Sequence, residues 1–303
     1  MFSRILKVFC VCTAALLMVQ PAVAQDTSVG RLSGTLQKIK ASGVIRLGHR
    51  LNSPPFSYLD ARGQPVGYSV DLCLALVDDV MAELGVEDLR VDFRPLTPEN
   101  RFSMLASGEV DIECGSTTDS PERRKQVAFS PTIFVTGTKL LVRKDGSIKS
   151  INDLKGKSVA VTLGTSNAAT MQLLSERRHL SLNLIASADH SGALELLAAG
   201  QVEAVANDEV LLYGLLAQTR GEKQYRVVGD FLSYDPYGLM FRRDDPAFAQ
   251  TIERGFRRLA TSRELVWIYE KWFLKRLPSG LRMGLPMSPQ LEQLFQIMGL
   301  NAD

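Results

Sequence analysis

The sequence predicts an α/β protein of two lobes, each built on a largely parallel sheet, joined by a two-strand hinge. Short β-type runs, such as 44–47, 110–112 and 159–161, alternate with longer helical patterns, such as 70–84. Two sequence patterns each occur twice along the chain, in the same order, and two further segments look like connections between the two halves that contain them. Together these observations predict two lobes of similar build.

The first residues predict an export signal. Arg4 and Lys7 precede an apolar run over residues 8–19, and the small residues 22–24 form a cleavage site before Gln25. The run is well short of the ~20 apolar residues that span a bilayer. We therefore expect residues 1–24 to be a cleaved signal peptide and the mature, secreted chain to begin near Gln25.

The charge of the mature chain excludes some classes of partner. The formal net charge is +2, and Arg4 and Lys7 account for it because residues 1–24 contain no Asp or Glu. Nucleic acids and anionic membrane surfaces favour proteins with a basic excess. A formally neutral mature chain therefore argues against both.

Two of the four cysteines remain after removal of the signal, namely Cys73 and Cys114. Two cysteines are too few for a disulfide scaffold. Cys73 lies within an apolar helical pattern and Cys114 beside a strand end, so we expect buried thiols rather than a disulfide.

The internal echoes indicate where the lobes lie. Residues 105–112 and 197–204 both read as an apolar helix end, a glycine suited to a left-handed cap, and a strand. Residues 40–48 and 155–162 both look like the first strand of a domain. Finding both echoes in the same order favours two similar lobes.

Segments 134–138 and 234–238 look like the two connections between the lobes. After the second, strand character resumes at 239–241 and helices follow that contain Trp267 and Trp272, which we expect in the core. The chain therefore returns to its first lobe. The predicted boundaries are lobe 1 at 25–137 and 236–303 and lobe 2 at 138–235.

A hinge between two α/β lobes places a cleft at the carboxyl ends of their strands. Three such places in the first lobe have groups that bind anions. Arg50 follows the first strand, and Arg101 begins a helix. In segment 115–123 a strand ends, the hydroxyls of Ser116 and Thr118 follow, and Ser120 before Pro121 predicts a helix start with Arg123 in its first turn. A helix N-terminus with an arginine suits a carboxylate.

The second lobe offers matching groups. Thr165 and Ser166 follow a strand and Gly164 and open a helix, while Asp208 ends another strand, where its carboxylate is placed to bind an ammonium group. An amino dicarboxylate has two negative groups and one positive group. Three arginines opposite one aspartate match that pattern, whereas a neutral ligand would leave buried arginines unpaired at a cost of ~3–5 kcal/mol.

The ordered set of motifs resembles the glutamate/aspartate-binding periplasmic proteins of ABC importers, in solute-binding protein family 3. The resemblance covers nearly the whole mature chain and implies the type II periplasmic-binding-protein fold. The matching motifs are GHR at 48–50, PFSY at 55–58, ECGSTT at 113–118, ER at 122–123, TIFV at 132–135, DLKGK at 153–157, DH at 189–190 and YG at 237–238.

The resemblance also implies roles by position. Arg123, with Ser116 and Thr118, corresponds to the residues that hold the α-carboxylate of the ligand and part of its amino group. Asp208 corresponds to the partner of the ligand ammonium.

The remaining positions that match the family surround the distal part of the ligand. Arg50, Arg101 and His190 correspond to the residues around the distal carboxylate. Thr165 and Ser166 correspond to hydroxyl residues of the second lobe that close over the ligand. Ser166 stands where the family usually has threonine. Pro98 stands where a hydroxyl to the distal carboxylate is expected, and it lacks an N–H as well. The preference between glutamate and aspartate therefore stays open.

The implied partners are L-glutamate or L-aspartate and the membrane permease of an ABC transporter, with the protein acting as a periplasmic monomer. No cofactor is implied. The alternative is a periplasmic cyclohexadienyl (prephenate/arogenate) dehydratase on the same fold, which needs a general acid or base in the cleft. Asp208 and His190 are better used as ligand partners. We find no nucleophile triad, and the three histidines lack metal spacing, so we expect neither catalysis nor a metal site.

Overall fold

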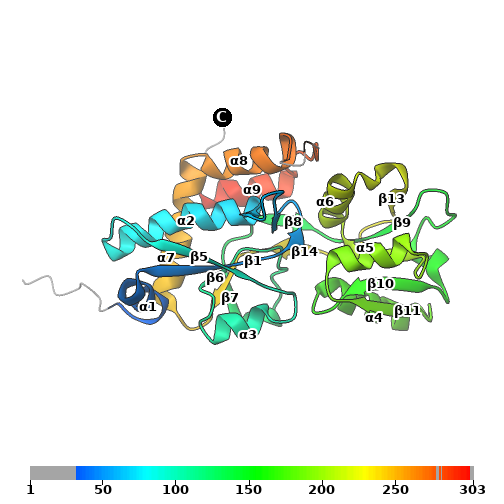
Figure 1. Ribbon diagram of the computed structural model, residues 1–303, viewed down its shortest axis with the longest axis horizontal. Coiled ribbons are helices and arrows are strands. Elements are labelled where there is room, and N and C mark those ends of the chain that lie inside the picture. The colour runs from blue at the N-terminus through cyan, green and yellow to red at the C-terminus, as the bar shows by residue number, and fades with distance from the viewer. Residues whose placement is uncertain (1–31, 278–279, 281, 301–303) are drawn as a thin grey trace, which may run out of the picture. The chain divides into compact units, whose positions relative to one another are not determined.

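The computed structural model describes residues 32–277, 280 and 282–300, which form one compact unit. The predicted signal peptide, residues 1–24, lies outside the described residues. Within these ranges no helix combines the length and the apolar character needed to cross a bilayer. The described chain contains two five-stranded sheets, each with its own helices, connected by a two-stranded ribbon (Figure 1).

The first sheet has the order β5-β1-β6-β15-β7. β1 pairs in parallel with β5 and β6, whereas β15 is antiparallel to both β6 and β7. The strands are β1 (Val44–His49), β5 (Arg90–Pro95), β6 (Ile112–Glu113), β7 (Val127–Phe129) and β15 (Met240–Arg242).

One continuous apolar core joins this sheet to the longest helices of the lobe. Leu72 and Leu76 of α2 and Phe256 of α7 are fully buried in it, which is the apolar stripe expected of a helix that covers a sheet. A small sheet of β2 (Asn52–Ser53), β3 (Ser57–Leu59) and β4 (Pro65–Val66) precedes α2. The helices are α1 (Gly34–Ser42), α2 (Tyr68–Leu84), α3 (Arg101–Ala106), α7 (Pro246–Thr261), α8 (Glu264–Tyr269) and α9 (Pro289–Met298).

The second sheet repeats the arrangement of the first, with the order β11-β10-β12-β9-β13. β10 pairs in parallel with β11 and β12, and β9 is antiparallel to both β12 and β13. The elements are β9 (Thr138–Arg143), β10 (Ser158–Thr162), α4 (Ser166–Arg177), β11 (Asn183–Ser187), α5 (His190–Ala198), β12 (Ala204–Asp208), α6 (Glu209–Thr219) and β13 (Tyr225–Val228).

The internal echoes predicted this duplication correctly. Gly108 and Gly200 both have left-handed backbone, with φ of 77° and 70°, and each precedes the third parallel strand of its sheet. The sheets are mixed, however, because one strand in each runs in reverse. β9 and β15 are these strands, and both enter their sheets directly from the connecting ribbon.

The ribbon consists of β8 (Phe134–Thr136) and β14 (Asp235–Tyr237), paired antiparallel. It is the two-strand hinge of the predicted fold class. Gly137 follows β8 where a Cβ atom would lie 2.1 Å from the carbonyl oxygen of Ser233, so only glycine fits the crossing without a backbone shift.

The expectation of free thiols was wrong, because Cys73 and Cys114 form a disulfide. Cys73 lies on the inner face of α2 and Cys114 follows β6, and both side chains are buried in the same core. Their Cα atoms are 6.1 Å apart, within the range that a disulfide spans. The contact depends on how the helix packs on the sheet, which local sequence patterns do not specify.

Replacing both cysteines with alanine should lower the free energy of unfolding by about 3–4 kcal/mol, because the bridge closes a loop with a sequence separation of 41 residues. Guanidinium unfolding of the oxidised protein, the reduced protein and the double variant measures the effect. The latter two should agree with each other. Equal midpoints for oxidised and reduced wild type would contradict the disulfide.

Only one of the two tryptophans lies in the core as expected. Trp272 is buried and donates from its indole Nε1 to Asp71 Oδ2 at 2.6 Å, whereas Trp267 is 60 % exposed. Five residues turn a helix by about 140°, and Trp272 lies in a π-helical turn (Glu270–Leu274) that follows α8. The two side chains therefore lie on different faces.

Candidate functional site

All nine predicted site residues line a single small cavity between the two sheets, together with Pro98, Asn167 and Leu211. The predicted residues of the first lobe are Arg50, Arg101, Ser116, Thr118 and Arg123, and those of the second lobe are Thr165, Ser166, His190 and Asp208. Most follow the carboxyl end of a strand, as expected of a site in an open α/β sheet.

Arg50 follows β1 and is 3 % exposed. Its backbone N–H donates to Ser57 Oγ at 2.8 Å. Within the described part of the chain its guanidinium forms no hydrogen bond. Burial lowers the pKa of Arg50, and the charge of Glu113 partly opposes this effect. A buried guanidinium with free donors is suited to an anionic ligand.

Arg101 is the first residue of α3 and is equally buried. Its Nη1 donates to Thr117 Oγ1 at 2.7 Å and its Nη2 to the carbonyl oxygen of Gly164 at 3.0 Å, while the buried Nε has no partner. Burial and the positive charge of Arg123 lower the pKa of Arg101 to about 9. Thr117 in turn donates to Glu113 Oε2 at 3.0 Å. The sequence interpretation gave neither Thr117 nor Glu113 this supporting role.

Arg123 lies in a single 3-10 turn, Arg123–Lys125, not in the α-helix that Ser120-Pro121 predicted. The start signal is still visible, since Ser120 Oγ accepts the N–H of Arg123 at 3.3 Å. The chain enters β7 at Val127, which leaves no room for a longer helix. The guanidinium donates to the carbonyl oxygens of Thr118 at 2.8 Å and Gly164 at 3.4 Å. Burial lowers the pKa of Arg123, and Asp235 opposes this effect.

The hydroxyl residues come from both lobes. Thr165 caps α4, accepting the N–H of Ala168 at 3.3 Å and donating to the carbonyl oxygen of Thr162 at 2.7 Å. Ser166 Oγ lies 3.0 Å from Thr118 Oγ1 of the other lobe. Ser116 is half-buried in the cavity wall.

His190 begins α5 and presents a neutral ring. Its Nδ1 lies 3.1 Å from both Thr162 Oγ1 and Asn207 Nδ2. Because an amide nitrogen only donates, Nδ1 accepts and the ring proton resides on Nε2. Burial and the charge of Arg50 lower the pKa of His190 to about 3. The ring therefore offers an N–H donor that stays neutral at physiological pH.

Asp208 ends β12 and is almost completely buried. Its Oδ1 accepts from Asn167 Nδ2 at 2.8 Å, and its Oδ2 accepts from the hydroxyl of Tyr237. Burial and the charge of Asp235 raise the pKa of Asp208 to about 7. Sequence reasoning did not identify Asn167 or Asp235 as residues that interact with Asp208. For Asn167 a signal existed in its position beside Thr165 and Ser166, at the start of a helix.

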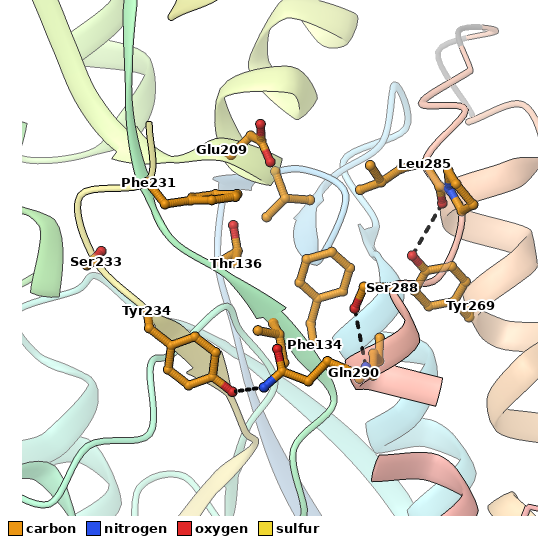
Figure 2. A pocket seen from close by; sticks show the side chains of 14 residues that line it. Phe134, Thr136, Glu209, Phe231, Ser233, Tyr234, Tyr269, Leu285, Ser288 and Gln290 are labelled. Carbon is orange, nitrogen blue, oxygen red and sulfur yellow. Dashed lines mark hydrogen bonds between the residues drawn. The ribbon is translucent and has the colours of Figure 1, made fainter. Parts of the chain in front are cut away.

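A larger cavity of about 520 Å³ lies beside the hinge, where Phe134, Phe231, Tyr234 and Tyr269 contribute aromatic walls (Figure 2). Gln290 Nε2 donates to the hydroxyl of Tyr234 across it at 2.7 Å. Its one charged lining residue, Glu209, forms an ion pair with Lys139 at 2.7 Å.

The larger cavity therefore lacks the cations that an amino dicarboxylate requires, although its volume would suffice. The described residues also contain no cluster of three or more His, Cys, Asp or Glu arranged to bind a metal ion. The small cavity, by contrast, is lined by three arginines and one carboxylate, together with several hydroxyl residues.

The chain is similar to bacterial proteins of one family. Residues 45–275 match the model of bacterial extracellular solute-binding proteins, family 3. The chain is 40% identical over 283 residues to an L-glutamate/L-aspartate-binding protein of Pseudomonas aeruginosa, covering 93% of this chain and 92% of that protein. It is 39% identical over 272 residues to a glutamate/aspartate import solute-binding protein of Escherichia coli, covering 89% and 90%.

Among solved structures, the chain resembles an ancestral amino acid-binding protein described as a precursor of cyclohexadienyl dehydratase. The TM-score is 0.68 at 28% identity, covering 79% of this chain and 99% of that one. The likeness supports the predicted two-lobed fold.

Proposed function

The chain belongs to the bacterial extracellular solute-binding proteins of family 3, and we propose that it captures L-glutamate or L-aspartate between its lobes and delivers it to the permease of an ABC importer. The observation that carries this proposal is the charge pattern of the small cavity. Arg50, Arg101 and Arg123 line it together with Asp208, which complements an ammonium group and two carboxylates.

The donors of the cavity divide between the two ends of such a ligand. Arg123, Ser116 and Thr118 line the same cavity as Asp208 and suit the α-carboxylate and ammonium groups. Arg50 and Arg101 offer free N–H groups to the distal carboxylate, and His190 offers its Nε2 proton. Pro98 lies in the same wall, where it contributes no side-chain donor, so the preference between glutamate and aspartate depends on the remaining donors.

Binding should be accompanied by closure of the lobes about β8 and β14. We propose that residues 138–235 move as one body relative to residues 25–137 and 236–303. Support comes from two apolar clusters that consist only of second-lobe residues and from cavity residues contributed by both lobes, while Val210, Leu211 and Ala217 of α6 pack into the core of the first lobe.

The proposed setting is the periplasm, after cleavage of residues 1–24, with the protein acting as a monomer. The family description, which calls these proteins extracellular, supports export, and the names of the relatives support a role in import. They also favour a binding protein over a dehydratase. Asp208 and His190, the two groups available for acid–base chemistry, are held by hydrogen bonds from Asn167, Tyr237 and Asn207.

Calorimetric titration with the common amino acids tests the proposed function. Glutamate and aspartate should bind tightly, glutamine and asparagine much more weakly, and lysine and arginine not measurably, because a second cation would face Arg50 and Arg101. Tightest binding of a neutral or basic amino acid would contradict the assignment. Turnover of prephenate or arogenate would support the dehydratase instead.

A further inference from the structure

A second buried carboxylate lies beside the cavity, on the hinge itself. Asp235 is the first residue of β14 and is 2 % exposed. It does not line the small cavity. It nevertheless reaches that cavity through Thr118, whose Oγ1 donates to Asp235 Oδ1 at 3.1 Å.

The hydroxyl of Thr118 has one proton, and Asp235 fixes where that proton points. A carboxylate is a stronger acceptor than the hydroxyl of Ser166, which lies 3.0 Å from the same oxygen. The proton of Thr118 therefore goes to Asp235. The lone pairs of Thr118 are left for donors in the cavity, such as an ammonium group.

The hinge also links Asp235 to Asp208. Ser233 Oγ donates to Asp235 Oδ2, and the hydroxyl oxygens of Ser233 and Thr138 lie 2.7 Å apart. Asn167 Nδ2 donates both to Thr138 Oγ1 and to Asp208 Oδ1, each at 2.8 Å. The two carboxylates therefore belong to one buried hydrogen-bond network that passes through the hinge.

We propose that Asp235 is a positioning residue of the ligand ammonium site, which orients Thr118 as an acceptor and adds a second negative charge beside Asp208. This inference rests on the proposed function, because it assigns a role toward the ammonium group of an amino acid. It adds a hinge residue to a site that was otherwise built from the ends of strands.

The groups that face Asp208 make this role measurable through pH. Burial and Asp235 raise the pKa of Asp208 to about 7, whereas the hydrogen bonds from Tyr237 and Asn167 and the charge of Arg123 lower it. His190 stays neutral, with a pKa near 3, and burial raises the pKa of Tyr237 well above its usual range. Asp208, with a pKa of about 7, therefore titrates between pH 6 and pH 8.

The sign of the pH effect follows from this titration. Below pH 7 the unliganded protein holds a proton on Asp208, and a bound ammonium must displace it. The affinity of wild type for glutamate should therefore fall about tenfold from pH 8 to pH 6, with release of a proton on binding at pH 6. The carboxylates of the ligand remain ionised throughout this window.

Asp235→Asn tests the proposal, because it keeps the size of the side chain but removes the charge. At pH 8 the variant should bind glutamate about tenfold to a hundredfold more weakly than wild type. Its affinity should fall less than that of wild type from pH 8 to pH 6, since the pKa of Asp208 is lower when residue 235 is neutral, while burial still raises it. Calorimetry in buffers with different ionisation enthalpies measures Kd and proton release together. Asp230→Asn, which alters an exposed carboxylate near the hinge, is the matched control and should behave as wild type.

Tyr237→Phe gives an opposite effect and serves if Asp235→Asn does not fold. It keeps the ring in the aromatic core but removes a hydrogen bond that lowers the pKa of Asp208. The acidic loss of affinity should therefore move to higher pH. Wild-type affinity and pH dependence in Asp235→Asn, or an unshifted profile in Tyr237→Phe, would overturn the inference. If wild type itself bound no acidic amino acid, the proposed function would be wrong instead.

Discussion

Replacing Arg50 with methionine should weaken binding of glutamate and aspartate by about 2–5 kcal/mol, which is roughly thirtyfold or more. The ligand carboxylate loses charge-assisted hydrogen bonds inside a closed cavity. The unliganded protein should keep its stability or gain some. The guanidinium of Arg50 is buried and forms no hydrogen bond within the described chain, and methionine removes the desolvated charge while it keeps the apolar contacts.

Calorimetry and thermal unfolding of Arg50→Met measure the two effects separately. Glutamine should lose much less affinity than glutamate, because it has no distal charge. Arg46→Met is the matched control, since Arg46 lies on β1, the strand that Arg50 follows, and does not line the cavity, with its Nε 3.9 Å from Asp92 Oδ2. Unchanged glutamate affinity in Arg50→Met would show that the distal carboxylate lies elsewhere.

The architecture could be predicted because its signals are local and repeated. Strand and helix periodicity, with a glycine cap at Gly108 and again at Gly200, indicated two lobes of one topology, and the sheets have the same strand order. The nine site residues could be gathered because most follow strand ends, which meet in such folds. Their ligand roles remain predictions.

Other features depend on side chains that meet only after packing. The Cys73–Cys114 disulfide joins a helix to a strand, and the partners of Asp235 lie 2 and 117 residues away along the chain. Trp267 was misplaced for a related reason. Its apolar neighbours suggested burial, but five residues separate it from the buried Trp272, so the two side chains lie on different faces of the helix. Periodicity defines the faces of an element, not the neighbours that each face contacts.

Gly214 is another position whose neighbours cannot be predicted from sequence periodicity, and its substitution should have a second large effect on binding. It lies within α6 of the second lobe, where sequence alone suggests only a weak point in a helix. In the structure, a Cβ atom at Gly214 would lie 2.0 Å from the carbonyl oxygen of Pro54 in the first lobe. The close approach joins the two lobes, so it should be required for closure and not for the folding of either lobe.

Substitution of Gly214 should therefore separate stability from binding. Alanine and leucine both favour helix over glycine by up to about 1 kcal/mol, so the unliganded second lobe should be as stable as wild type or more so. Overpacking against the Pro54 backbone costs typically ~1–3 kcal/mol and more for a large side chain. Gly214→Ala should weaken glutamate binding by about fivefold to 150-fold, and Gly214→Leu should abolish the compaction that small-angle scattering detects on adding glutamate.

Gly146→Ala is the control in the same lobe, because its Cβ would meet only the carbonyl oxygen of Arg143 at 3.4 Å. Tight binding with full compaction in Gly214→Leu would mean that the lobes close on the ligand without bringing α6 against Pro54.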